Sequence, residues 1–463
     1  IMITNNLILG GYNMINSIKS SVFYHIYPLG FCGVINNKKN YTKKAGLSKI
    51  DDKWINHFTQ LGINSIYFGP LFQSTYHGYD TIDYLKIDDR LGTNADFKQL
   101  VRKLHDNNIS VIVDGVFNHV GREFWAFKDV IDKKSQSPYT SWFNINFNGN
   151  SNYNDGFYYE GWEGHYDLVK LNLYNKEVKN YLFEVIEKWI NEFEIDGIRL
   201  DVAYLLPKEF LKELREKTTQ FKNDFWLMGE MIHGDYNSIA SPEMLHSATN
   251  YELYKGLYSG HNEKNYFEIA YSLNREFGDY GIYKNIDLYN FVDNHDVNRI
   301  ASMVNTKEYL KNIYTILFTI PGIPSIYYGS EWAIEGDRKI SDLNLRPELF
   351  LEDFENDIDA KNIEKFISNL ISIRTKNIEL TQGCYKEILV KNKQFVFGRG
   401  YNDKWILIAL NLDNKEEILQ FNVPFANSTL INLLDKTEKL NVKDYKLNIS
   451  IPAFSSKILK EEE

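Results

Sequence analysis

Eight short runs of β-branched and aromatic residues recur along the first 380 residues, and most are separated by amphipathic stretches. The runs begin at Ser21, Ile63, Ile109, Ile195, Phe225, Ser247 (the weakest), Tyr289 and Ile323. In the clearest intervening stretches, apolar residues recur at intervals of three and four, which predicts helices over 51–62, 95–108, 176–194, 307–319 and 361–374. This alternation predicts a (β/α)8 TIM barrel, with a doubly wound open sheet as the structural alternative.

Two intervals depart from the alternation. Residues 118–170 are rich in Asn, Gly, Ser and aromatics and lack a helical period, which indicates an excursion domain after the third strand. Beyond about residue 380 only strand patterns occur, which predicts a C-terminal antiparallel β-sandwich domain. The expected organisation is an N-terminal extension (1–19), the barrel (20–117 and 171–380), the excursion domain (118–170) and the C-terminal domain (381–463).

Charge and composition narrow the classes of partner. The net charge of −10 indicates no basic patch for nucleic acid or anionic lipid. The sequence contains no run of 18 apolar residues, so we expect no membrane span. No secretory signal stands out, and Cys32 and Cys384 are expected to be two unpaired thiols, so we expect a cytoplasmic protein. The aromatic share of 15% is typical of a well-filled core, although exposed Tyr and Trp also suit flat ligands such as sugar rings.

Polar residues follow four of the expected strands. In a (β/α)8 barrel the carboxyl ends of the strands converge on the active site. Each such residue could be a helix N-cap, but four strands that supply them at the same end favour a shared pocket. The residues are Asp114, Asn118 and His119 after the third strand, Arg199 and Asp201 on the fourth, Glu230 after the fifth, and His295 and Asp296 after the seventh.

These side chains suit two chemistries, namely metal-assisted hydrolysis and glycoside hydrolysis with a carboxylate nucleophile and a carboxylic acid. A metal site would favour a His-x-His pair or a His-Glu-x-x-His helix, and neither pattern occurs. Arg199 fits poorly beside a cation. It fits well beside Asp201, where a charge-assisted hydrogen bond would keep a nucleophilic carboxylate ionised.

Four motifs in fixed order carry a family resemblance: "DGVFNH" (114–119), "DGIRLDVA" (196–203), "GE" (229–230) and "FVDNHD" (291–296). The set resembles the signature regions of the α-amylase family, glycoside hydrolase family 13. "HGYDTIDYLKIDDRLGT" (77–93) and "PGIPSIYYGSE" (321–331) extend the resemblance over roughly residues 20–380. It implies a retaining glycosidase that needs no cofactor and takes an α-glucan or maltooligosaccharide as its substrate.

The resemblance implies a role for each carboxylate. Asp201 would be the nucleophile, Glu230 the general acid and then base, and Asp296 the group that binds sugar hydroxyls in the transition state. Glu230 must begin protonated, so we expect burial and carboxylate neighbours to raise its pKa. Arg199 is expected to shift the pKa of Asp201 in the opposite direction.

Further substrate contacts follow from the same resemblance. His119 and His295 would donate to hydroxyls of the cleaved sugar, and Tyr79 would lie under its ring beside His77 and Asp80. Asp114 is expected to support the nucleophile and Arg199, and Asp293 and Asn294 to serve structure. Asp342 and Arg346 have the spacing of a family pair that lines the donor side, and a surface ion pair between them is the alternative.

Many α-amylases hold a structural calcium through an Asn, which is Asn118 here, an Asp in a short conserved stretch and a His four residues after the nucleophile. This chain has Lys170 in place of the Asp and Leu205 in place of the His. A calcium site that has an ammonium in place of a carboxylate is implausible. We therefore expect no metal there, and the hypothesis is that Lys170 occupies the space.

The stretch "LVKLN" (168–172) resembles "MPKLN" of neopullulanases, cyclomaltodextrinases and maltogenic amylases. Their N-terminal β-domain is not expected here, and Ile232 stands where they commonly have Trp. The expected activity is retaining hydrolysis of α-1,4-glucosidic bonds in maltodextrins, starch fragments or cyclodextrins. The alternatives are an α-glucosidase or transglycosylase for short oligosaccharides and, more remotely, a non-catalytic sugar-binding relative.

Overall fold

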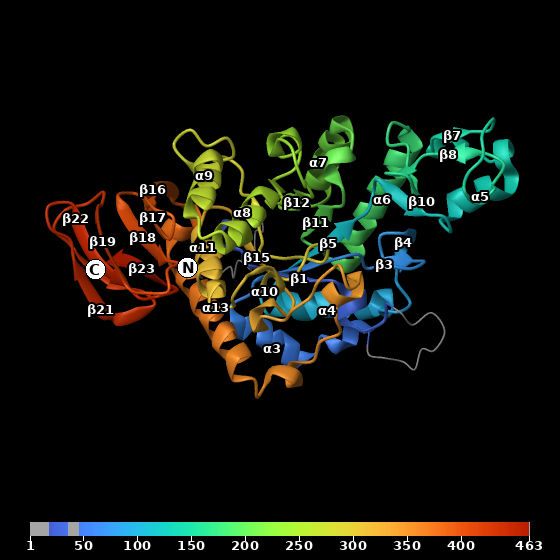
Figure 1. The fold of residues 1–463 in the computed structure, drawn as a ribbon. Helices are drawn as coiled ribbons and strands as arrows, with labels where there is room; N and C mark the ends of the chain where they lie inside the picture. The colour runs from blue at the N-terminus through green and yellow to red at the C-terminus, as the bar shows by residue number, and fades with distance from the viewer. Residues whose placement is uncertain (1–17, 36–45, 463) are drawn as a thin grey trace, which may run out of the picture.

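The computed structural model describes residues 18–35 and 46–462, and Figure 1 shows its fold. Eight parallel strands lie side by side in the order β13-β12-β11-β5-β2-β1-β15-β14. A parallel bridge between Thr249 and Tyr289 joins the two ends of this sheet, so the barrel is closed as predicted. The strands are Phe23–Ile26 (β1), Ser65–Phe68 (β2), Ser110–Gly115 (β5), Gly197–Leu200 (β11), Trp226–Gly229 (β12), Ser247–Ala248 (β13), Tyr289–Asn290 (β14) and Ile323–Tyr327 (β15).

Helices surround the barrel, and side-chain caps fix where several of them begin. The carboxylate of Asp51 accepts hydrogen bonds from the backbone of Lys53 and Trp54, and Thr93 forms a capping box with Asp96. Within the described part of the chain, no helix has the length and apolar character needed to cross a bilayer. The helices are Pro28–Phe31 (α2), Asp52–Leu61 (α3), Asn94–Asp106 (α4), Lys176–Phe193 (α6), Lys208–Phe221 (α7), Tyr251–Asn262 (α8), Tyr266–Phe277 (α9), Ile300–Met303 (α10), Tyr309–Thr319 (α11), Asp342–Leu345 (α12), Ile358–Lys376 (α13) and Ile378–Gln382 (α14).

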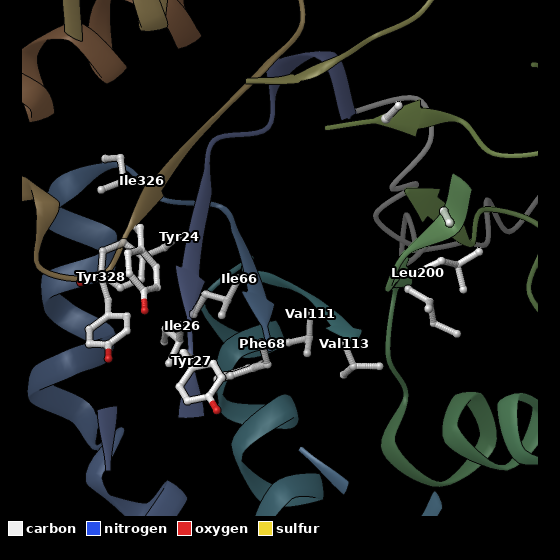
Figure 2. Packing of buried hydrophobic residues seen from close by; sticks show 14 of the residues in the cluster. Tyr24, Ile26, Tyr27, Ile66, Phe68, Val111, Val113, Leu200, Ile326 and Tyr328 are labelled. Carbon is white, nitrogen blue, oxygen red and sulfur yellow. The ribbon is translucent and has the colours of Figure 1, made fainter. Parts of the chain in front are cut away.

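The strands place alternate side chains in two different cores, because successive side chains on a strand point to opposite faces. Figure 2 shows members of the outer core, including Ile66 and Phe68 of β2 and Val111 and Val113 of β5. Tyr67, one position along from Ile66, belongs instead to a smaller buried cluster inside the barrel. That cluster also includes Phe23, Ile112, Trp226, Met228, Tyr289 and Ile323.

The excursion begins directly after β5 and forms small antiparallel sheets beside the barrel (Figure 1). The strand that returns towards the barrel, β10, pairs with β6 and with β9. β7 and β8 form a separate two-stranded antiparallel sheet. The elements are His119–Gly121 (β6), Trp125–Lys133 (α5), Ile145–Asn146 (β7), Tyr158–Tyr159 (β8), Gly161–Trp162 (β9) and His165–Lys170 (β10), and a two-stranded sheet of Phe72–Ser74 (β3) and Thr81–Ile87 (β4) lies beside β6.

The C-terminal region is an antiparallel β-domain, in agreement with the fold predicted. A six-stranded sheet and a two-stranded sheet enclose a separate apolar cluster that includes Leu407, Phe421 and Leu459. The sequence patterns missed β21 and β23, and the run predicted as a strand from Ser247 becomes helix α8 at Tyr251. The strands are Cys384–Val390 (β16), Gln394–Tyr401 (β17), Lys404–Asn411 (β18), Glu417–Asn422 (β19), Thr429–Asn432 (β20), Asp435–Asn441 (β21), Lys446–Ile451 (β22) and Ser455–Glu461 (β23).

Candidate active site

A cavity of about 760 Å³ opens where the barrel strands end. Asp201, Glu230 and Asp296 line it together, although the three residues come from different strand ends. Of the other predicted site residues, Tyr79, His77, His119, Asp342 and Arg346 also line the cavity. Tyr27, Ile35, Tyr76, Trp162, His165, Asp167, Leu168, Ile232, Tyr251, Val297, Arg338, Ser341 and Leu343 complete the wall.

The guanidinium of Arg199 contacts three carboxylates. Its Nη1 lies 3.0 Å from Asp201 Oδ1, and its Nη2 lies 2.9 Å from Glu230 Oε1. The same Nη1 binds both oxygens of Asp114, which β5 presents beside Arg199 in the barrel register. Asp114 also accepts hydrogen bonds from the hydroxyls of Tyr67 and Tyr79. Asp114 is therefore buried next to Arg199 and binds its guanidinium.

Val202, which follows Asp201, has a φ of +41°. This left-handed conformation is strained for a β-branched residue and is held here by its surroundings. The strained turn directs the backbone N–H of Val202 at Glu230 Oε2, at 2.9 Å. One oxygen of Glu230 thus contacts Arg199 and the other contacts Val202, so both oxygens of the Glu230 carboxyl group have a defined partner.

Burial raises the pKa of Glu230, although Arg199 opposes the shift. This is the direction that we expected for a general acid. Burial also raises the pKa of Asp201, and here the expectation was wrong, because Arg199 lowers that pKa but does not outweigh desolvation and the neighbouring carboxylates. One guanidinium shared among three buried carboxylates neutralises each of them only in part.

Asp296 has the opposite electrostatic environment. Its Oδ2 lies 2.9 Å from His295 Nε2, and its Oδ1 lies 3.0 Å from Arg346 Nη2. Burial alone would raise the pKa of Asp296, but His295 and Arg346 outweigh it and hold the pKa well below its usual range. Asp296 is therefore the carboxylate that stays ionised most persistently.

The rings of Tyr79, His295 and Tyr27 are stacked against one another. Tyr79 lies 5.5 Å from His295 between ring centroids, and Tyr27 lies 5.7 Å from it. The Tyr79 hydroxyl contacts His295 Nε2. The resemblance placed His295 against the sugar, but His295 lies behind the wall, where Asp296 and Tyr79 engage its Nε2.

His119 faces the cavity with one ring nitrogen unpaired. Its Nδ1 lies 3.1 Å from Asn118 Nδ2, whereas its Nε2 is buried, has no hydrogen-bond partner and lies 4.0 Å from Asp201 Oδ2. Donation from the Asn118 amide to Nδ1 leaves the ring proton on Nε2. Burial lowers the pKa of His119 to about 3, so the ring is a neutral donor directed at the site.

The remaining predicted pairs are placed as follows. Asp80 is buried behind the wall and accepts a hydrogen bond from the backbone N–H of His77 at 3.0 Å. Asp342 and Arg346 both line the cavity but do not form the surface ion pair that was the alternative. Asp342 instead pairs with Arg338 at 3.1 Å, while Arg346 turns inward to Asp296.

Asp293 and Asn294 hold the loop that carries Asp296. Asp293 accepts hydrogen bonds from the backbone of Ile300 at 2.9 Å and from the Ser330 hydroxyl at 2.8 Å. The Asn294 side chain accepts a hydrogen bond from the backbone of Asp296 at 2.8 Å. Both residues therefore serve the structural role that the sequence suggested.

Lys170, which the sequence places at a family calcium ligand, forms an ion pair with Glu160. Its Nζ lies 2.5 Å from Glu160 Oε1, and Glu160 also accepts a hydrogen bond from Asn144. Over the residues that the structure describes, no three His, Cys, Asp or Glu side chains are grouped as a metal site would require. The residues present at this position therefore do not fit a cation, and the ion pair links β10 to the rest of the excursion.

Sequence reasoning missed several residues of the wall. Tyr27 follows β1, Tyr251 begins α8, and Trp162 lies at the end of β9. Only the high aromatic share hinted at them, since none lies within a motif that we had assigned to the site. Arg338 had no signal of its own in the sequence.

A closed (β/α)8 barrel with three carboxylates at the carboxyl ends of its strands is compatible with glycoside hydrolysis. Residues 47–378 match the family described as "Alpha amylase, catalytic domain", and the chain belongs to the α-amylase family.

Two curated relatives and one solved structure illustrate the similarity. A cyclomaltodextrinase of Thermoanaerobacter pseudethanolicus is 34% identical over 383 residues, which cover 81% of this chain and 65% of that protein. An intracellular maltogenic amylase of Bacillus subtilis is 29% identical over 422 residues, covering 86% of this chain and 69% of that protein. A solved cyclomaltodextrinase structure has a TM-score of 0.87 at 26% identity, covering 97% of this chain and 79% of that one.

Proposed function

We propose that this glycoside hydrolase cleaves α-1,4-glucosidic bonds in maltodextrins or cyclodextrins and retains the anomeric configuration. The observation that carries the proposal is that one guanidinium, Arg199, binds both Asp201 and Glu230 through neighbouring nitrogens. Retaining glycosidases need two carboxyl groups ~5–5.5 Å apart. Two carboxylates that bind one guanidinium are close neighbours, and this closeness supports the proposal.

In the proposed reaction, an oxygen of Asp201 attacks the anomeric carbon while Glu230 gives its proton to the leaving oxygen. The glycosidic bond breaks and a glycosyl ester forms on Asp201. Glu230, now ionised, takes a proton from water, which attacks the ester and restores both carboxyl groups. The raised pKa of Glu230 supports its protonation at the start.

Asp296 and His119 are proposed to bind the sugar during this reaction. Asp296 stays ionised and would accept hydrogen bonds from sugar hydroxyls, while the free Nε2–H of His119 would donate one. Tyr79, which lines the cavity beside them, would supply the apolar face under the ring. We assign His295 to the positioning of Asp296.

The choice of substrate rests on the relatives, whose names specify cyclomaltodextrins and maltogenic action. The chain spans 65% of the cyclomaltodextrinase's length, so the substrate is a proposal for this chain. An α-glucosidase or transglycosylase acting on short oligosaccharides is the second candidate. We also propose a cytoplasmic location, which is supported by the intracellular relative.

A substrate panel with product chromatography tests the proposal. We expect cleavage of maltoheptaose and β-cyclodextrin, whereas turnover of panose or sucrose alone would favour the second candidate. Proton NMR during maltoheptaose cleavage should show the α-anomer of the product first, and the β-anomer first would exclude retention. Asp201→Asn should abolish turnover, while Asp89→Asn, which alters an exposed carboxylate paired with Lys86, serves as the matched control.

A further inference from the structure

His25 is a buried histidine that the proposed reaction does not use. It lies on β1 between Tyr24 and Ile26, which both belong to the outer core (Figure 2). Because side chains alternate along a strand, His25 points into the barrel, as Phe23 does two positions earlier. His25 is 3% exposed and does not line the cavity. It is therefore part of the barrel interior and does not contact the substrate.

The imidazole of His25 packs against two rings that support the proposed catalytic groups. Its centroid lies 4.3 Å from that of Tyr67, with the two rings stacked, and 5.1 Å from that of His295, with the rings nearly perpendicular at 87°. The Tyr67 hydroxyl donates to Asp114 at 2.8 Å, and His295 Nε2 lies 2.9 Å from Asp296 Oδ2. One side chain thus contacts a partner of Asp114 and a partner of Asp296.

The contact with Tyr67 leads to the proposed nucleophile and acid. Asp114, which accepts the Tyr67 hydrogen bond, binds Arg199, whose guanidinium also binds Asp201 and Glu230. If Tyr67 moved away, the buried Asp114 carboxylate would lose a donor and draw Arg199 towards itself. Arg199 lowers the pKa of Asp201 against the effect of burial, so that pKa would then rise further.

Stability alone does not explain a histidine at this position. The inner cluster around it is made of apolar and aromatic residues, such as Phe23 and Ile112. Among the described residues, His25 Nε2 and His295 Nδ1 are both buried without a hydrogen-bond partner. An unpaired buried nitrogen destabilises a fold, and an apolar side chain of similar size would avoid this loss. The histidine therefore calls for an explanation from the site that it adjoins.

The charge state of His25 suits a residue placed beside the ion pair of His295 and Asp296. Burial lowers the pKa of His25 well below its usual range, and His295 and Arg199 lower it further. The ring therefore stays neutral and does not compete with His295 for Asp296. The titratable and charged groups around His25 are Tyr67, Tyr327, His295, Asp296, Arg199 and Arg299.

We propose that His25 is a positioning residue that holds Tyr67 against Asp114 and His295 against Asp296. This inference rests on the proposed function, because it concerns the groups that carry that reaction. His25 touches no reacting atom and acts through the two rings that it contacts. A single buried ring would thus fix both the Arg199 network and the separate carboxylate Asp296.

The test is the pH dependence of kcat/KM for maltoheptaose. His25→Ala should lower kcat/KM by about 10-fold or more, because small displacements of catalytic groups are costly in rate. The acid limb reports the ionisation that Asp201 needs in the proposed reaction. This limb should move up by about 0.5 pH unit or more, because a displaced Arg199 lowers the pKa of Asp201 less. His25→Phe, which keeps a flat ring, should restore most of the rate and the wild-type limb.

Phe23→Ala is the matched control, since Phe23 is a fully buried ring on the same face of β1. It should reduce stability but leave the acid limb unshifted. A variant that is only partly folded loses rate at every pH without moving the limb, so the two effects can be told apart. If His25→Ala does not fold, His25→Leu takes its place, because Leu fills the space without a flat ring.

An unshifted acid limb in His25→Ala would overturn the inference, and so would a loss in His25→Phe as large as that in His25→Ala. An equal shift in Phe23→Ala would overturn it as well, because any cavity in the barrel interior would then have the same effect. Wild-type protein that cleaves neither maltoheptaose nor β-cyclodextrin would instead contradict the proposed function on which the inference rests.

Discussion

Arg199 Nη2 lies 2.9 Å from Glu230 Oε1, and both side chains are buried. The cation that orients Glu230 also binds Asp201 and Asp114. The ionisation of each of these carboxyl groups is therefore linked to that of the others. This shared arginine gives the most direct tests of the site.

Replacing Glu230 by Gln should lower kcat on maltoheptaose by about 10²-fold or more, because the leaving oxygen loses its proton donor. The loss in kcat/KM should be much smaller on maltosyl fluoride, since fluoride leaves without protonation and kcat/KM does not include hydrolysis of the ester, in which Glu230 acts as the base. Steady-state kinetics on both substrates provide the measurement. Wild-type activity of the variant on maltoheptaose would rule out Glu230 as the acid.

Replacing Arg199 by Leu should lower the free energy of unfolding by ~3–5 kcal/mol at pH 7, because three buried carboxylates lose their cation. The deficit should shrink as the pH falls, since protonated carboxyl groups no longer need that cation. Urea unfolding at pH 7 and at lower pH tests this. Arg102→Leu, which breaks an exposed pair with Glu194, should cost ~0–1 kcal/mol and is the control.

Glu276 on α9 should make stability depend on pH. Its Oε2 accepts a hydrogen bond from Asn250 at 2.8 Å, its Oε1 is buried without a partner, and burial raises its pKa to about 8. The folded protein holds a proton that the unfolded chain releases near pH 4.5, so stability should fall as the pH rises from about 4.5 to 8. Glu276→Gln should flatten this decline in urea unfolding, and an unchanged slope would contradict the assignment.

Removal of divalent cations should leave the protein unchanged. Lys170 stands where the family has a carboxylate ligand, and its ammonium forms an ion pair with Glu160. Thermal unfolding and maltoheptaose cleavage should therefore be the same with EDTA as with added calcium. Stoichiometric calcium in a metal analysis, together with a lower Tm in EDTA, would refute this.

The barrel could be predicted because periodicity is a local property. Each strand and each predicted helix leaves a pattern within about ten residues, and parallel strands then place their carboxyl ends together. From that rule we predicted that Asp201, Glu230 and Asp296 share one pocket, and in the structure all three line one cavity. In contrast, β21 carries mostly polar, exposed residues and offered no apolar run to detect.

The side-chain partners and pKa shifts that the sequence did not predict depend on contacts between residues that are distant along the chain. The spacing of Asp342 and Arg346 left a surface ion pair between them as an alternative, but α12 ends before Arg346, which turns to Asp296. The pKa of Asp201 depends on its burial and on how many carboxylates share Arg199. Neither the burial of a carboxyl group nor the number of carboxylates around one arginine can be read from a motif. The sequence therefore identified the groups but not the direction in which the pKa of Asp201 is shifted.

The contact between Asn118 and His119 has a consequence for how the site responds to acid. The amide fixes the imidazole proton on Nε2, and burial keeps the pKa of the ring at about 3. Through the ordinary range of pH, this donor neither gains nor loses a proton. A change in pH would therefore act on the proposed reaction through the carboxyl groups, while the proposed hydrogen bond from His119 to a sugar hydroxyl would stay constant.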